Sequence, residues 1–481
     1  MSRDVSDSEL RAALHRVADM VADYLQDVGK YPVLPKVQPG EVASMLPGIA
    51  PRHGESLDRI LDDYARIIEP NVTHWNHPGF LGYFSITGSG PGILGEALAA
   101  ALNVNAMLWR TSPAATELEE RVCDWLRQML GLPEIFRGHI NDTASVSTML
   151  ALAAARHAQP DLDIRELGLA GRPEIPELVV YISDQAHSSC DKAVMTLGLG
   201  LRQVRRIVSD EQFRMRLDSL AEAVEADRRA GRRPMAVVAT AGTTSTTSVD
   251  PMDRIAELCQ REGLWLHVDA AYAGSAAICP ELRGQFSGWE RADSIVFNPH
   301  KWLFTPIDCS VLLMRDVDTL KSAFSLVPDY LKTDEEGVTN LMDLGVQLGR
   351  RFRSLKLWMV IRAFGVEGLQ DRIREHCRMA RDLVSLIDQD PDFAVVAPVP
   401  FSVVCFRWIA GDSPEQQDSL NEVLLNEVNA QGPVFVTSTV LKGRYTLHLA
   451  IGNLKTTDQH IQEAWQIIRA AADSVSAAQL R

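Results

Sequence analysis

Between about residues 138 and 315, short apolar runs alternate with segments of helical periodicity. The runs are L-V-V-Y-I-S (178–183), M-A-V-V-A-T (235–240), L-W-L-H-V-D (264–269), S-I-V-F-N (294–298) and S-V-L-L-M (310–314). Runs of this length without a polar face are typical of strands that are covered on both sides. Their alternation with helices predicts an α/β fold whose sheet is mostly parallel and covered by helices.

The rest of the chain predicts two further regions, because 481 residues exceed what one hydrophobic core usually holds. Before the alternating region, helices are expected over about 8–28 and 56–68, separated by a proline-rich stretch. After it, the last hundred or so residues mix helices with short strands. We therefore expect a helical, dimer-forming segment over 1–88, a large α/β domain over 89–365 and a small α+β domain over 366–481.

The formal net charge of −15 argues against nucleic acid or an anionic membrane as a partner. No stretch approaches the ~18 apolar residues that cross a bilayer, and the N-terminus has no apolar run, so we expect neither a membrane span nor a signal peptide. The seven cysteines are scattered without a C-x-x-C pair, which predicts reduced thiols in a cytoplasmic protein. We expect no metal site, since His74 and His77 in H-W-N-H have no acidic or cysteine partner nearby.

Two of the apolar runs lead into charged residues that together suit one cofactor. Asp269 ends the run at 264–269, and Lys301 follows the run at 294–298. The carboxyl ends of parallel strands meet at one edge of a sheet, where ligands bind in open α/β folds. A lysine amine there can form a Schiff base with pyridoxal 5′-phosphate (PLP), and a carboxylate can keep the pyridine nitrogen protonated, so that the ring acts as an electron sink. The pair therefore predicts a PLP site.

Each residue also has a plainer explanation when it is taken alone. Asp269 could cap the next helix or hold magnesium, and Lys301 could be one solvated lysine among many. The pair makes these explanations weaker, because Lys301 lies in the apolar segment N-P-H-K-W-L-F, where lysine is normally avoided. The segment G-P-G-I-L-G (90–95) matches a dinucleotide motif, but it has neither a preceding strand nor an acidic residue at the end of a second strand.

Three further segments place polar side chains after a predicted strand or at a helix start. Thr143 and Ser145 open a helix rich in alanine and leucine, whose free N–H groups could bind a phosphate or could simply be N-capped. His187 follows the run at 178–183 and could stack on the cofactor ring, although a lone histidine there is more often structural. Thr244, in T-A-G-T-T-S, could meet the ring edge or belong to an ordinary turn.

By these motifs the sequence resembles the group II PLP-dependent amino acid decarboxylases, and among them the aromatic-L-amino-acid decarboxylases. The resemblance covers nearly the whole chain. The stretches that carry it are V-T-H-W-N-H-P-G-F-L-G-Y-F, S-P-A-A-T-E-L-E, S-D-Q-A-H-S-S, G-T-T-S, W-L-H-V-D-A-A-Y-A-G-S-A-A-I-C-P-E, F-N-P-H-K-W, D-Y-L-K and L-G-R-R-F-R-S-L-K-L-W. It implies the aspartate-aminotransferase-like fold (fold type I), PLP as cofactor, and loss of CO₂ from an L-amino acid.

The resemblance implies roles for the residues that match the family's motifs. Lys301 resembles the Schiff-base lysine, Asp269 the partner of the pyridine nitrogen, and His187 the histidine that stacks on the ring, with Ala271 against the ring face. Tyr330, in S-L-V-P-D-Y-L-K-T, resembles the mobile-loop tyrosine that returns a proton to Cα after CO₂ leaves. The remaining cofactor-binding positions are Ala144, Ser145, Asn298 and His300 near the phosphate, and Thr244 in the matching turn.

The implied substrate pocket departs from the pattern of the animal enzymes at two positions. Its members are Trp75, Tyr83, Phe84, Ile86, Met107 and Gly349. Ile86 stands where a threonine is usual and cannot donate a hydrogen bond to a ring hydroxyl, and Met107 replaces a phenylalanine with a flexible side chain. Gly349 leaves room for a bulky ring. We therefore expect tryptophan or phenylalanine to be at least as good a substrate as tyrosine or DOPA.

The expected function is PLP-dependent decarboxylation of an L-amino acid, in the first place an aromatic one, to the amine and CO₂. Three alternatives stay open: an aldehyde synthase that decarboxylates and then uses O₂, a decarboxylase of a non-aromatic amino acid, and a catalytically silent PLP-fold binding protein. Among relatives, replacement of the tyrosine or histidine that correspond to Tyr330 and His187 tracks the synthases, so their presence ranks that alternative lower. The family further implies a homodimer, whose shared sites are completed by the partner around residues 105–107 and by the lid.

Overall fold

The computed structural model describes the whole chain except residues 1–4, 327–334, 336 and 480–481. Its contacts divide the chain into two units. The first comprises 1–85, 390–393 and 407–481, and the second comprises 86–389 and 394–406. The division into three regions expected from the sequence stays a prediction. In the part of the chain that is described, no helix has both the length and the apolar character that a membrane crossing requires.

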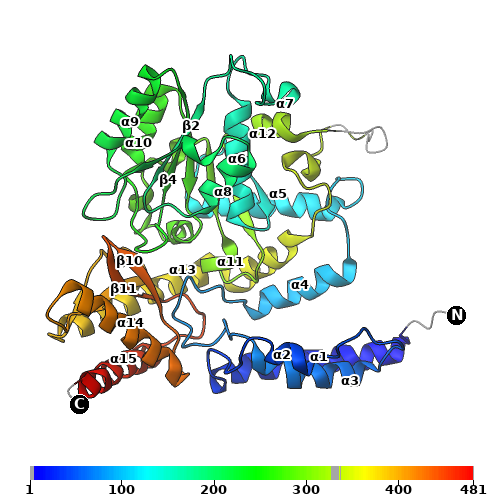
Figure 1. Cartoon of the computed structure of the whole chain (residues 1–481). Coiled ribbons are helices and arrows are strands. Elements are labelled where there is room, and N and C mark those ends of the chain that lie inside the picture. Colours follow the sequence, from blue (N-terminus) through cyan, green and yellow to red (C-terminus); the bar gives the residue numbers. More distant parts are fainter. Residues whose placement is uncertain (1–4, 327–334, 336, 480–481) are drawn as a thin grey trace. The chain divides into compact units, whose positions relative to one another are not determined.

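The second unit is built on a seven-stranded sheet with helices against it (Figure 1). The strand order is β1 (Arg137–Asn141), β7 (Ser310–Met314), β6 (Ser294–Phe297), β5 (Trp265–Asp269), β4 (Arg233–Thr240), β2 (Leu178–Ser183) and β3 (Val204–Ile207). Neighbouring strands from β6 to β3 are parallel, and β7 is antiparallel to both β6 and β1. The prediction of a mostly parallel sheet covered by helices is therefore confirmed.

All five apolar runs form strands, whereas the sequence did not predict β1 and β3. These two strands are the edges of the sheet. Their sequences, R-G-H-I-N and V-R-R-I, are less apolar than those of the inner strands, and both are only partly buried. An edge strand has a neighbour on one side only and keeps more contact with solvent, so it needs no continuous apolar run.

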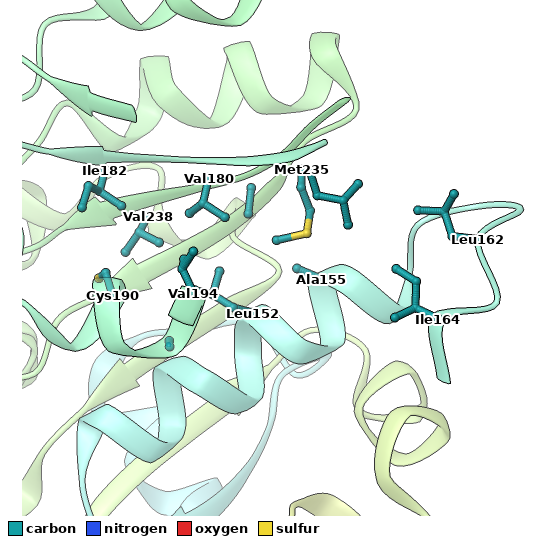
Figure 2. Packing of buried hydrophobic residues seen from close by; sticks show 13 residues of the cluster. Leu152, Ala155, Leu162, Ile164, Val180, Ile182, Cys190, Val194, Met235 and Val238 are labelled. Atoms are coloured by element: carbon teal, nitrogen blue, oxygen red, sulfur yellow. The ribbon is translucent and has the colours of Figure 1, made fainter. Parts of the chain in front are cut away.

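Helices α6 and α8 pack against one face of the sheet. Figure 2 shows Leu152 and Ala155 of α6 and Val194 of α8 packed against Val180 of β2 and Val238 of β4, all of them fully buried. This packing holds α6 against the sheet. The helices of the second unit are α4 (Gly90–Leu102), α5 (Pro113–Leu130), α6 (Ala144–His157), α7 (Ile164–Leu167), α8 (Ser189–Thr196), α9 (Leu217–Arg229), α10 (Met252–Glu262), α11 (Pro299–Trp302), α12 (Val317–Phe324) and α13 (Arg353–Asp388).

The first unit consists of N-terminal helices and of helices and strands from the C-terminal part of the chain. Its α1 starts with a capping box, in which the Ser6 hydroxyl accepts the Glu9 N–H at 3.3 Å and the Glu9 carboxylate accepts the Ser6 N–H at 3.1 Å. Strands β10 and β11 form an antiparallel hairpin. The bounds of its helices and strands are α1 (Asp7–Asp27), α2 (Glu41–Met45), α3 (Leu57–Asp63), α14 (Pro414–Gln431), β10 (Thr437–Leu441), β11 (Arg444–Ala450) and α15 (Asp458–Gln479). Strands β8 (Phe393–Val395) and β9 (Val403–Trp408) belong mostly to the second unit.

A buried ion pair connects α5, β1 and the segment that precedes α13 in the second unit. The Arg350 guanidinium lies 2.8 Å from the Glu119 carboxylate and donates to the Ile140 carbonyl at 2.7 Å. The same Glu119 oxygen accepts the Ile140 N–H at 2.8 Å. Both charged side chains are only 2% exposed. Loss of either partner would therefore leave the other charge buried without its counter-ion.

We expect Glu119→Ala to lower the free energy of unfolding by about 3–5 kcal/mol, because it leaves the Arg350 charge uncompensated in the interior. Denaturant unfolding followed by circular dichroism would measure the change. The solvent-exposed pair of Glu225 and Arg229 offers a matched control, and Glu225→Ala should leave the unfolding midpoint nearly unchanged. Similar small changes in both variants would show that burial of the Glu119 pair does not stabilise the fold.

Candidate active site

Six strands of the seven-stranded sheet, all except β7, end at the same edge. Strands β3, β2, β4, β5 and β6 are parallel, and β1 has the same direction because β7 is antiparallel to both β1 and β6. The register aligns Thr240 of β4 with Asp269 of β5, and Asp269 with Val296 of β6. Beyond β6, Asn141 at the end of β1 pairs with Ser310 at the start of β7. The cofactor-binding residues expected from the sequence follow these strand ends, so the structure brings them to one edge.

Asp269 and Lys301 are held beside each other by backbone hydrogen bonds between the segments that follow β5 and β6. The Asp269 carboxylate is buried and accepts the Ala271 N–H at 3.1 Å. The Asn298 N–H donates to the Ala271 carbonyl at 3.1 Å, and the Lys301 N–H donates to the Asn298 carbonyl at 2.9 Å. Burial lowers the pKa of the Lys301 amine, and the Asp269 charge opposes this shift. A lysine with a lowered pKa is more often neutral and can attack an aldehyde.

His187 shares the electrostatic environment of this pair. It follows β2 by four residues, and its Nδ1 accepts the Ser189 N–H at 3.2 Å and lies 2.9 Å from the Ser189 hydroxyl. Burial lowers the pKa of the His187 imidazole; the Asp269 carboxylate opposes this shift, and the Lys301 ammonium adds to it. A neutral ring with Nδ1 as acceptor carries its proton on Nε2. The imidazole therefore presents an aromatic face and one N–H donor.

The start of α6 provides an anion-binding end for the site. Thr143 is the N-cap residue of this 14-residue helix, and its side chain makes no capping hydrogen bond, so the N–H groups of the first turn, which includes Ala144 and Ser145, are not capped by it. The Ser147 hydroxyl lies 3.0 Å from the Ser310 hydroxyl and accepts from the Asn141 amide at 3.1 Å. These contacts attach the first turn of α6 to the ends of β1 and β7.

His300 is connected to this helix start through the segment that leads into β7. The Nδ1 of His300 accepts the Cys309 N–H at 2.9 Å, and Cys309 directly precedes Ser310. Burial, with the Lys301 charge as the next cause, lowers the pKa of His300 to about 3, so the ring is neutral and Nε2 is a donor. The Asn298 side chain is buried, and its Oδ1 has no hydrogen-bond partner among the described residues.

The turn after β4 is organised by hydroxyl groups of residues other than Thr244. The Thr243 hydroxyl lies 2.9 Å from that of Thr246, which lies 2.9 Å from that of Ser248. Thr244, the expected ligand-binding residue, is exposed on this turn. The turn is joined to the site because the Ala241 N–H donates to the Asp269 carbonyl at 2.8 Å. The neighbours of Thr244 thus form an ordinary Gly/Thr turn, and the Thr244 side chain remains exposed on it.

The residues expected in the substrate pocket are distributed over both units. Trp75, Tyr83 and Phe84 belong to the first unit, where the Trp75 and Tyr83 rings stack with centroids 5.9 Å apart. Ile86 and Met107 belong to the second unit and are half-buried, and Gly349 belongs to it and is exposed. Tyr330 lies outside the described residues.

Met107 and Gly349 are separated by 242 positions, yet their segments are paired. The Arg350 N–H donates to the Asn105 side-chain oxygen at 2.9 Å, and the Ala106 N–H donates to the Arg350 carbonyl at 2.9 Å. Arg350 was not among the site residues expected from the sequence, and the buried Glu119 holds it in place. The arginine cluster G-R-R-F-R was visible in the sequence, but nothing in it marks which arginine is buried.

The groups at this edge match the functional groups of PLP. An amine with a lowered pKa suits the aldehyde, a buried carboxylate suits the basic ring nitrogen, and free helix N–H groups with the Nε2–H of His300 suit the phosphate. The unpartnered Oδ1 of Asn298 indicates that its buried amide is available to a ligand. A mostly parallel sheet with this set of groups at its carboxyl edge defines a PLP-dependent enzyme of fold type I.

Comparisons with known proteins specify the family. The pyridoxal-dependent decarboxylase conserved domain matches residues 39–409. Phenylacetaldehyde synthase of Arabidopsis thaliana is 42% identical over 482 residues, which cover 98% of this chain and 97% of that protein. Tryptophan decarboxylase 2 of Oryza sativa subsp. japonica is 40% identical over 485 residues, which cover 98% and 96%. A crystal structure of Oryza sativa TDC with PLP and tryptamine has a TM-score of 0.94 and 38% identity, covering 98% of this chain and 99% of that one.

The chain therefore belongs to the pyridoxal-dependent decarboxylase family, and it is a PLP-dependent amino acid decarboxylase. This confirms the resemblance, the fold class and the cofactor that were inferred from the sequence motifs.

Proposed function

We propose that the enzyme converts an aromatic L-amino acid to the corresponding amine and CO₂, with tryptophan and phenylalanine as leading substrates. The observation that carries the proposal is the buried Asp269 beside Lys301 at the carboxyl edge of the sheet. The aromatic substrate is supported by relatives named for tryptophan decarboxylation and phenylacetaldehyde synthesis. The match to a structure solved with tryptamine supports a pocket of indole size.

The chemistry of each group at the site indicates its role in the reaction. Bound PLP supplies an electron sink for the electron pair that CO₂ leaves behind. Lys301 anchors the cofactor through Nζ, and Asp269 holds a proton at the pyridine nitrogen, which keeps the ring cationic. His187 presents its ring face to the cofactor, while His300 Nε2–H and the first turn of α6 bind the phosphate. Tyr330 would return a proton to Cα, a role that rests on the resemblance alone.

The expected pocket of the second unit favours a large side chain. A Cβ atom at Gly349 would meet only the Asn105 amide nitrogen, at 3.9 Å, so position 349 borders open space. Met107 is half-buried and packs against Leu108 and Met342, where its flexible side chain can adapt to different rings. Ile86 has no group that could hydrogen-bond a ring hydroxyl. These features support indole and phenyl rings over catechol.

We expect Gly349→Leu to lower kcat/KM for tryptophan relative to phenylalanine by about tenfold or more, because the added side chain occupies the space that the larger ring needs. Steady-state kinetics with both substrates would measure the ratio. Gly284→Leu is the matched control, since a Cβ atom there meets nothing within 4 Å, and the ratio should stay unchanged. Equal losses with the two substrates would mean that Gly349 does not border the substrate ring.

Product analysis tests the proposed reaction. PLP-loaded enzyme would be incubated with each aromatic L-amino acid, and with glutamate and 2,4-diaminobutyrate, while CO₂, amine, aldehyde and peroxide are quantified. We expect equal amounts of amine and CO₂ from an aromatic substrate. Turnover of only the controls would support a non-aromatic substrate. A protein without visible Schiff-base absorption after PLP addition would be a silent binding protein.

An aldehyde synthase is the second candidate, because a phenylacetaldehyde synthase is 42% identical to this chain. The presence of Tyr330 and His187 supports the amine as the product. Tyr330→Phe provides the comparison within one protein: wild-type enzyme should release amine, and the variant should release more aldehyde and peroxide. Aldehyde and peroxide from the wild-type enzyme would assign it to the oxidative reaction.

We also propose that the enzyme is a cytoplasmic homodimer. Helix α4 exposes Leu94, Leu98 and Leu102, which are spaced four residues apart and form one apolar stripe. In the first unit, α1 exposes Leu10 and Leu14 in the same spacing. A second copy of the chain would cover such stripes in a large interface. Analytical ultracentrifugation should give the mass of two chains, and the mass of one chain would contradict the proposed dimer.

The proposed cytoplasmic location is supported by the cysteines. All seven are free thiols, which suits a reducing compartment.

A further inference from the structure

The last residue of β4, Thr240, carries a buried polar group that the proposed function does not use. Its side chain is 4% exposed, and its Oγ1 has no hydrogen-bond partner among the described residues. A buried hydroxyl without a partner has lost its hydrogen bonds to water and gained none in exchange. Such groups are rare in native proteins and call for a specific explanation.

Thr240 points to the same side of the sheet as Asp269. Val238, two residues before Thr240, packs against α6 and α8 (Figure 2), and side chains two residues apart in a strand share a face. His267, two residues before Asp269, lies 3.4 Å through Nε2 from the Thr148 hydroxyl of α6. Thr240 and Asp269 are also register partners on adjacent parallel strands, which lie about 4.8 Å apart. The hydroxyl and the carboxylate are therefore neighbours.

The backbone at Thr240 is held firmly in this position. Its N–H donates to the buried Asp250 carboxylate at 2.8 Å, and its carbonyl accepts the Asp250 N–H at 3.0 Å. The next residue, Ala241, donates its N–H to the Asp269 carbonyl at 2.8 Å. The end of β4 is thus fastened on both sides, which fixes the direction of the Thr240 Cα–Cβ bond towards the Asp269 side of the sheet.

We propose that Thr240 is a positioning residue of the PLP site, and that its hydroxyl donates a hydrogen bond to the Asp269 carboxylate when the cofactor is bound. The carboxylate has acceptor capacity for it, because the only donor to its oxygens found among the described residues is the Ala271 N–H. A donor to the ionised form favours that form and fixes its orientation. The inference rests on the proposed role of Asp269 towards the pyridine nitrogen.

The test compares Thr240→Val, which keeps the shape and removes the hydroxyl, with Thr240→Ser, which keeps the hydroxyl. For each variant, the PLP dissociation constant and the thermal unfolding midpoint with and without PLP would be measured. We expect Thr240→Val to bind PLP about tenfold more weakly or worse. Without PLP its midpoint should not fall below that of the wild type, because the variant removes an unsatisfied buried group. Thr240→Ser should bind PLP like the wild type.

Two results would overturn the inference. The first is wild-type PLP affinity in Thr240→Val. The second is an equal fall of the unfolding midpoint with and without PLP, which would indicate a purely structural role. If Thr240→Val does not fold, Thr240→Ala compared with Thr240→Ser repeats the test. Asp269→Asn separates the two proposals: if it leaves PLP affinity and turnover unchanged, the proposed role of Asp269 fails; if only the Thr240 variants have no effect, the inference about Thr240 fails alone.

Discussion

Replacing Lys301 with alanine should abolish decarboxylation, with kcat reduced by about 10⁴-fold or more. The variant loses the amine that anchors the cofactor aldehyde, and no neighbouring residue carries an equivalent group at the end of β6. Release of CO₂ measures the activity, and the visible Schiff-base absorption should disappear at the same time. Borohydride reduction of the wild-type enzyme, followed by peptide mass spectrometry, should place the reduced cofactor on Lys301.

The exposed Lys321 of α12 provides the control for this experiment. Lys321→Ala should keep both the absorption and the activity, because its amine lies on the surface of the second unit. Two outcomes would contradict the assignment of Lys301: a Lys301→Ala enzyme that retains the wild-type absorption, or a cofactor label on a different lysine.

Asp269→Asn should lower kcat/KM by about 10²–10³-fold while the protein still folds. Asparagine has nearly the same shape and can still accept the Ala271 N–H through its side-chain oxygen, as Asp269 does at 3.1 Å. It cannot carry the negative charge that holds a proton on the pyridine nitrogen, so the ring becomes a weaker electron sink. Steady-state kinetics measures the loss.

A second measurement shows where this loss arises. The Asp269→Asn enzyme should keep the visible absorption of the cofactor on Lys301, because the lysine is unchanged. Asp269→Glu keeps the charge but displaces it, and it should fall between the wild type and the asparagine variant. Near-wild-type turnover in Asp269→Asn would mean that the carboxylate does not act on the cofactor ring.

The inner part of the fold could be predicted from the sequence because inner strands must be apolar on both faces. The run at 264–269 and β5, and the run at 294–298 and β6, agree to within one residue at each end. The edge strands β1 and β3 escaped prediction for the converse reason: an edge strand tolerates arginine, glycine and asparagine, so its sequence resembles that of a loop.

The proposed cofactor-binding residues could be selected from the sequence for a related reason. Lys301 and Asp269 are charged residues next to apolar runs, where a charge is costly and therefore conspicuous. Thr240 gave no such signal, because a threonine at a strand end is ordinary; only the register with Asp269 and the missing partner of its hydroxyl distinguish it. Glu119 and Arg350 are 231 positions apart, and no local pattern reveals that they form a buried pair.

By itself, the sequence determined the α/β class and PLP as the cofactor, and it led to the proposal that Asp269 and Lys301 carry the charges of the site. These properties depend on local patterns, namely the apolar runs and the polar residues at their ends, which act over a few residues. Only the tertiary structure decided the strand order, the neutral state of His300, the pairing of the segments around Met107 and Gly349, and the neighbour of Asp269 on β4. These depend on contacts between residues far apart in the chain and on the burial that packing creates, and neither is encoded in any single segment.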